Sequence, residues 1–234
     1  MTTVIPTCWI CGAVADSAEH MVKASDFRVM FPERTQNAPA YRHSKHRINE
    51  PVRGAKASVL KFKPSLCQPC NNARSQSWDR AWEALEKGIR EARPRLSKGS
   101  RIPLGRIFAV NRQNSMLHIH QFFTKLLGCV AVEYDVPLPI ASFARHLRSD
   151  TAEPKLRIVF VHIPAGSTKD KIQIGYVNAT TDITTGEVMT AVWHYIVGSL
   201  GVAVSYVRPG QSQLRFTANR GWHPNDVNRT WKLR

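Results

Sequence analysis

Apolar residues recur at helical spacing in two long segments of the chain. In the first segment, four of them share one face of a helix: Trp78, Trp82, Leu85 and Ile89. This helix is expected to begin at Asn71 and to end near Arg93, because the proline at position 94 disfavours helical geometry in its predecessor. Residues 114–132 show the same period, and a shorter helix is expected at 139–149.

The pattern in the C-terminal third is typical of strands. Residues 156–163 and 172–177 flank a turn-rich stretch at 164–167, and further short strands are expected at 213–217 and at 58–63. Residues 188–207 contain no charged side chain for twenty positions, which is long enough to span a bilayer. We prefer to interpret them as a buried hairpin. His194 interrupts the apolar run, a Gly-Ser-Leu-Gly turn divides it, and the residues on both sides of the turn are β-branched and aromatic.

These elements predict an α+β fold in two domains. Residues 94–105 are rich in proline, glycine and basic side chains, so the boundary is placed there, between a domain of residues 1–105 and one of residues 106–234. The second domain is expected to contain a small antiparallel sheet packed by two helices. Cys129 lies on the apolar side of its first helix and is expected to be a buried thiol.

The charge of the chain is strongly positive, with 33 Lys and Arg against 17 Asp and Glu and a net charge of +16. Residues 28–63 hold nine basic and two acidic side chains and few large apolar ones, which indicates a basic insertion in an exposed loop or ribbon. The charge indicates a nucleic-acid partner, and DNA, RNA and branched nucleic acid are all open at this point. The candidates for phosphate contacts are Arg42, Lys45, Arg47, Arg53, Lys56, Lys61, Lys63 and Arg74. His43 and His46, three positions apart, fit phosphate contacts better than a metal site.

The cysteines carry the most specific signal. Cys8 and Cys11 form one C-x-x-C pair and Cys67 and Cys70 form another, as a tetrahedral structural Zn²⁺ site requires. A redox pair is less consistent, because no βαβ pattern accompanies either motif. The first residues lack the basic and apolar regions of a signal peptide, so a cytoplasmic protein without membrane association is expected.

Three further features accompany the cysteine pairs. A glycine follows the first pair, the dipeptide Glu19-His20 comes eight residues after Cys11, and Asn71 directly follows the second pair. Over residues 8 to about 90 the chain resembles the zinc-stapled HNH endonucleases and uncharacterised bacterial and phage proteins that carry this motif. The resemblance implies an N-terminal zinc-stabilised ββα-metal module, treble-clef-like, that cleaves DNA in phage biology or bacterial defence. His20 is then the general base. Glu19 and Asn71 hold a catalytic Mg²⁺ or Mn²⁺, and the four cysteines hold structural zinc.

Each of these roles has an alternative. His20 can be a zinc ligand or a surface residue, Glu19 a surface carboxylate paired with a lysine, and Asn71 a helix cap. Asp79 is either a further acidic contact or an ion-paired helix residue. For the whole chain, the alternatives are a catalytically degenerate, zinc-stabilised nucleic-acid-binding protein and a scaffold whose C-terminal domain binds a protein partner.

Overall fold

The computed structural model describes residues 5–34, 37–92, 97–164, 171–210, 221–226 and 231–234. It has an α+β fold with a small antiparallel sheet and a four-cysteine cluster near the N-terminus. Within the described ranges, every helix is too short or too polar to cross a bilayer. The predicted strand at 213–217, most of the turn at 164–167 and the predicted helix end at Arg93 lie outside the described residues.

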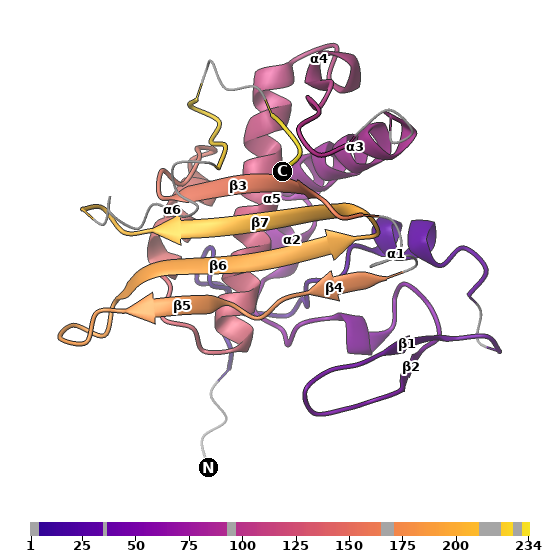
Figure 1. Ribbon diagram of the computed structural model, residues 1–234. Helices are drawn as coiled ribbons and strands as arrows, with labels where there is room; N and C mark the ends of the chain where they lie inside the picture. Colours follow the sequence, from indigo (N-terminus) through magenta and orange to yellow (C-terminus); the bar gives the residue numbers. More distant parts are fainter. Residues whose placement is uncertain (1–4, 35–36, 93–96, 165–170, 211–220, 227–230) are drawn as a thin grey trace.

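The sheet is antiparallel throughout and contains the predicted hairpin. Its strands are β3 (Leu156–His162), β4 (Ile172–Ile174), β5 (Asn178–Thr181), β6 (Val188–Val197) and β7 (Leu200–Val207). The order is β3-β7-β6-β4, and β5 pairs with the other end of the same edge of β6 (Figure 1). The strand predicted at 172–177 is shorter than expected. β5 had no apolar alternation to reveal it, because all four of its residues are exposed.

The helices are α1 (Ala24–Met30), α2 (Gln68–Asn71), α3 (Gln76–Ala92), α4 (Leu104–Ile107), α5 (Arg112–Glu133) and α6 (Ile140–Arg148). The helices predicted at 114–132 and 139–149 are confirmed. The helix predicted to begin at Asn71 is wrong at its start, because two helices replace it. The first ends at Asn71, and the second begins after Ser75, whose carbonyl accepts the N–H of Asp79 at 2.9 Å.

The basic insertion at residues 28–63 is only partly a ribbon. It contains the short strands β1 (Ala40–Arg42) and β2 (Glu50–Val52), but α1 overlaps its start. The strand predicted at 58–63 is wrong, since residues Ser58–Leu60 form a 3₁₀ turn. That turn directs Leu60 into a small apolar cluster formed by Val22, Phe27, Ala40, Val52 and Leu60.

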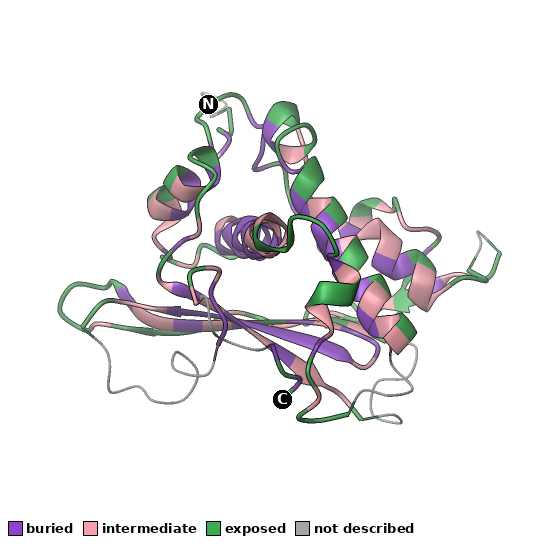
Figure 2. Ribbon diagram, turned by 90° about the horizontal axis from the view of Figure 1, so that it is seen from above, coloured by how far each residue is buried: buried purple, intermediate pink, exposed green. Residues whose placement is uncertain are grey.

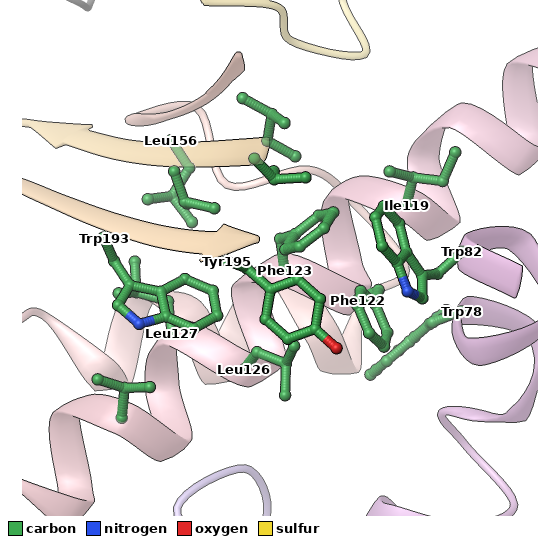
Figure 3. Close-up of a cluster of buried hydrophobic side chains, with 14 of the residues drawn as sticks. Trp78, Trp82, Ile119, Phe122, Phe123, Leu126, Leu127, Leu156, Trp193 and Tyr195 are labelled. Carbon is green, nitrogen blue, oxygen red and sulfur yellow. The ribbon is translucent and has the colours of Figure 1, made fainter. Parts of the chain in front are cut away.

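Helix α5 lies at the centre of the molecule. Thirteen consecutive residues, 119–131, are buried, and Figure 2 shows this helix end-on between the sheet and the N-terminal segments. Phe122 stacks on Trp82 of α3 with ring centroids 5.6 Å apart, and Tyr195 of β6 meets the edge of the same indole (Figure 3). Apart from the small cluster around Leu60, the buried apolar residues of the two halves therefore form one continuous cluster, which includes Cys8, Cys67 and Cys70.

Candidate functional site

Four sulfur atoms meet at one point beside the core. The Sγ atoms of Cys8, Cys11, Cys67 and Cys70 all lie within 4.8 Å of one another, and those of Cys11 and Cys67 are 3.4 Å apart. Four thiolates placed tetrahedrally at about 2.3 Å from zinc are about 3.8 Å from one another. The donor set and its spacing therefore fit a structural zinc-like site, as the paired motifs predicted.

Tight turns create this convergence. The Cys8 carbonyl accepts the N–H of Gly12 at 2.8 Å, and Gly12 has a φ of +81°, a conformation that glycine adopts without strain. At the second pair, the N–H of Asn71 donates to the Cys67 carbonyl at 3.0 Å and closes the single turn of α2. Each turn directs two sulfurs to the same side of the backbone.

The cysteine thiols differ in their surroundings. The Ala13 backbone N–H lowers the pKa of the Cys11 thiol to about 7, whereas burial raises the pKa of Cys67 and Cys70. A bound metal ion deprotonates such thiols outright, because its charge replaces the missing solvation of the thiolate. Cys129 is fully buried outside the cluster, as predicted, and burial raises the pKa of its thiol to about 12.

Glu19 is a buried carboxylate, not a surface one. Its Oε2 lies 2.5 Å from Nζ of Lys125, and its Oε1 accepts the backbone N–H of His20 at 3.0 Å. The segment around it is held by the Phe62 N–H, which donates to the Glu19 carbonyl at 2.9 Å. Both carboxylate oxygens therefore have partners, and one partner is a cation.

Lys125 is the residue of this site that sequence reasoning missed. It lies in the buried part of α5, is completely inaccessible, and also donates to the Ser75 hydroxyl at 3.1 Å. Burial acts against its charge, but the carboxylates of Glu19 and Asp79 outweigh that effect and raise the pKa of the Lys125 ammonium. A lysine between two apolar pairs, Phe-Phe-Thr-Lys-Leu-Leu, was the available signal, because charged residues are seldom fully buried without a partner.

His20 is half-buried beside this ion pair. Burial lowers the pKa of its imidazole, with an opposing influence from Glu19, so the ring is neutral at pH 7. Its Nε2 is buried without a hydrogen-bond partner among the described residues. His20 does not belong to the cysteine group, so the described residues give no support for a role as a zinc ligand.

Asn71 does not cap a helix. Its Nδ2 donates to the Ser17 hydroxyl at 2.9 Å, and its Oδ1 is buried without a partner among the described residues. The Ser75 hydroxyl donates to its carbonyl at 2.7 Å and accepts from Lys125, so hydrogen bonds connect Asn71 with the Glu19 ion pair. The structure thus brings Asn71, Glu19 and the neighbouring His20 into one polar network at the edge of the core.

The Glu19 carboxylate and the Asn71 amide oxygen make this network suitable for a hard cation. Oxygen atoms of carboxylates and amides are the usual protein ligands of Mg²⁺, and a buried carbonyl oxygen without a partner is costly unless an ion or a water satisfies it. The Oδ1 of Asn71 is such an atom. Glu19 and Asn71 therefore fit the residue types that a catalytic cation needs, although Lys125 already binds the Glu19 carboxylate.

The predicted phosphate-binding residues fall into two groups. Arg42 and Arg47 both contact the Glu50 carboxylate, at 3.4 and 3.0 Å, and Lys63 donates to the Glu133 carbonyl at 3.1 Å. The other five have no ion pair within the described residues: Lys45, Arg53, Lys56, Lys61 and Arg74. All of these except Lys61 are exposed.

The two histidines of the insertion are exposed and separate from any metal-binding group in the described parts of the chain. His43 Nδ1 accepts the N–H of Asn49, which has a φ of +59° in the loop between β1 and β2. This contact stabilises the loop and gives no support for a metal site.

Comparison of the chain with protein-family models, with curated proteins and with solved structures finds no match.

Proposed function

We propose that the protein is a metal-dependent endonuclease of HNH type that hydrolyses phosphodiester bonds of DNA. The observation that carries the proposal is a pair of buried polar atoms, His20 Nε2 and Asn71 Oδ1, that have no partner in the part of the chain that the structure describes. Their residues join the network around Glu19 through backbone atoms, because the His20 N–H donates to Glu19 and the Asn71 carbonyl accepts the Ser75 hydroxyl. A buried polar atom without a partner calls for an explanation, and at these two atoms a bound ion, a water or a catalytic role provides one.

His20 supplies the base of the proposed reaction. Its lowered pKa leaves the imidazole neutral at pH 7, so Nε2 accepts the proton of a water molecule whose oxygen attacks phosphorus. The bond from phosphorus to the 3′-oxygen breaks in the same displacement. The backbone N–H of His20 donates to Glu19 Oε1, and this hydrogen bond fixes the backbone of His20 relative to the Glu19 carboxylate.

Glu19 and Asn71 are the residues that would hold the divalent cation. When bound, Mg²⁺ or Mn²⁺ supplies positive charge that stabilises the phosphate oxygens and the leaving 3′-oxygen. Asn71 is oriented for this role by Ser17, which accepts its amide N–H and leaves the carbonyl oxygen as the ligand atom. The four-cysteine site fixes the start of α2 and with it the position of Asn71.

Exposed cations without ion pairs support a nucleic-acid substrate. Lys45, Arg53, Lys56 and Arg74 are exposed and have no carboxylate partner in the described residues, so phosphates can replace water around them. Such contacts are largely independent of base sequence. These exposed cations favour a nucleic acid as the substrate, and they do not indicate which base sequence it has.

Cleavage of supercoiled plasmid by the purified zinc-loaded protein tests the proposal. We expect cleavage in Mg²⁺ or Mn²⁺, none with EDTA, and a loss of at least about a hundredfold in rate for His20→Ala, as for removal of a general base. His43→Ala is the matched control, because His43 is an exposed histidine outside the network. Equal rates for wild type and His20→Ala would reject His20 as the base.

A zinc-stabilised nucleic-acid-binding protein without catalytic activity is the second candidate. The ion pair between Lys125 and Glu19 favours it, because the ammonium already neutralises the carboxylate on which cation binding depends. This candidate predicts DNA binding with a steep salt dependence and no cleavage with any divalent cation. The plasmid experiment therefore separates the two functions.

A further inference from the structure

The surroundings of the Lys125 ammonium resemble those of a bound cation. Nζ lies 2.5 Å from Glu19 Oε2, 3.1 Å from the Ser75 hydroxyl and 3.7 Å from Asp79 Oδ1. These three oxygens come from two segments of the N-terminal half, Glu19 from one and Ser75 and Asp79 from around the start of α3, whereas Lys125 comes from α5. Most lysines extend their charge to water, but this side chain is completely buried.

A charge in this position must be balanced inside the protein. Taking an ammonium out of water costs several kcal/mol, which is offset only by close carboxylates and hydrogen bonds. Glu19 provides the closest negative charge, so its carboxylate is neutralised before any divalent cation arrives. A second cation at the same carboxylate experiences repulsion from Lys125, and this repulsion is strong in a buried setting.

We propose that Lys125 is a tethered cation that competes with a divalent metal ion for Glu19, and that metal binding requires the ammonium to pair with Asp79 instead. This inference rests on the proposed function for the location of the metal ion. It adds a residue from the C-terminal half to the control of that site. The competition makes occupancy by Mg²⁺ or Mn²⁺ depend on the position of a single side chain.

Asp79 is placed to receive the displaced ammonium. It already lies within 3.7 Å of Lys125 Nζ, and its other cationic partner, Lys23, lies 3.1 Å away. Lys23 also contacts Glu83 at 3.5 Å. When Lys125 moves towards Asp79, Lys23 therefore keeps a carboxylate partner, and every charge in the group stays paired.

Calorimetric titration of the zinc-loaded full-length protein with Mn²⁺, in the absence of DNA, tests the proposal. Lys125→Met keeps a long apolar side chain and removes the charge, so we expect at least tenfold tighter binding. Asp79→Asn removes the alternative partner, so we expect at least threefold weaker binding. Glu83→Gln changes a carboxylate that contacts only Lys23 of this group, so the affinity should not change. Glu19→Gln should abolish the tight site.

Two results with Lys125→Met would overturn the proposal. Unchanged Mn²⁺ affinity would mean that the ammonium does not affect the site, and weaker Mn²⁺ binding would mean that the ammonium organises it. Absence of Mn²⁺ binding by both wild type and Lys125→Met would also overturn it. Circular dichroism and zinc content check that the variant folds. If Lys125→Met unfolds without metal, the proposal requires that Mn²⁺ restores its folding and that Asp79→Asn binds more weakly; failure of either result overturns it.

The outcomes distinguish this inference from the proposed function. Tighter Mn²⁺ binding by Lys125→Met without any plasmid cleavage would reject the endonuclease and leave the competition intact. Cleavage by wild type combined with the same Mn²⁺ affinity in Lys125→Met would retain the endonuclease and reject the competition.

Discussion

The hydroxyl of Tyr195 donates a 2.6 Å hydrogen bond to the carboxylate of Asp26. Tyr195 belongs to β6 of the C-terminal sheet and Asp26 to α1, close after His20, so the bond joins the sheet to the neighbourhood of the candidate site. Trp82 Nε1 donates to the same carboxylate oxygen at 3.0 Å. Burial raises the pKa of Asp26 to about 7, although these two hydrogen bonds act in the opposite direction.

Replacement of Asp26 by Asn is expected to change how stability depends on pH. The unfolded carboxyl has a pKa of about 3.9, so between about pH 4 and pH 7 the native state binds the proton more tightly. The stabilisation that protonated Asp26 gives to the native state is therefore complete at low pH and is lost as the pH rises to about 7. Asp26→Asn should match wild type in thermal stability near pH 4 and exceed it at pH 8.

The control for this prediction is Glu91→Gln, which changes an exposed carboxylate on α3. Thermal melting of the three proteins across this pH range measures the effect. The other titrating groups are the same in wild type and Asp26→Asn, so their contribution cancels in the difference between the two melting temperatures. The groups that face Asp26 are Tyr195, Trp82, Glu86 and Lys23. A difference that is constant with pH would contradict the assignment.

Loss of one cysteine from the cluster should release the metal and destabilise the protein. Cys67→Ser is expected to lose stoichiometric zinc and more than about 4 kcal/mol of unfolding free energy, because loss of a metal site is among the few changes with such large effects. Cys129→Ala is the control, since Cys129 is buried outside the cluster and should keep one zinc. Elemental analysis and urea unfolding measure both quantities. Full zinc content in Cys67→Ser would contradict the site.

The packing of the first cysteine pair against α5 should be sensitive to one methyl group. A Cβ at Gly128 would lie 2.5 Å from Cη2 of Trp9, the residue that follows Cys8. Gly128→Ala is therefore expected to cost about 1–3 kcal/mol through overpacking and to weaken zinc retention. Gly105→Ala, on the short helix α4 with open space around the new methyl, should be neutral. Equal urea midpoints for the two variants would show that Trp9 does not pack there.

Nucleic-acid binding should depend on the exposed cations of the insertion. In the triple variant Lys45→Gln, Arg53→Gln, Lys56→Gln, the slope of log affinity against log salt should become shallower by about 0.9 for each phosphate that the variant leaves without a cation. Fluorescence anisotropy with a DNA duplex at several salt concentrations measures this slope. Lys87→Gln on α3, where Lys87 pairs with Glu91, is the control. An unchanged slope in the triple variant would exclude the insertion as the binding surface.

The elements with strong periodicity could be predicted from the sequence. The hairpin of β6 and β7 and helix α5 follow from their own apolar patterns, and the four-cysteine cluster follows from two short spacings. The break between α2 and α3 could not be predicted, because the apolar residues that define the period all lie in α3 and none of them marks where that helix begins. β5 was missed because its pairing with β6 is made by the backbone of exposed residues.

The candidate site was predictable only as far as short motifs reach. Glu19, His20 and Asn71 became candidates because the motif that they form with the cysteine pairs resembles that of HNH endonucleases. The partner of Glu19 comes from α5, and nothing near either residue in the sequence indicates that the two meet. Such a contact depends on how the two halves pack, and so its effect on the site is visible only in the structure.

The proposed endonuclease depends above all on a divalent cation held by Glu19 and Asn71 beside His20. Anomalous scattering from crystals of the zinc-loaded protein soaked in Mn²⁺, collected at the zinc and manganese edges, tests this most directly. We expect a zinc peak among the four cysteine sulfurs and a separate manganese peak in contact with the Glu19 carboxylate and Asn71 Oδ1. A zinc peak alone, with Lys125 still paired with Glu19 at saturating Mn²⁺, would contradict the proposed cation site.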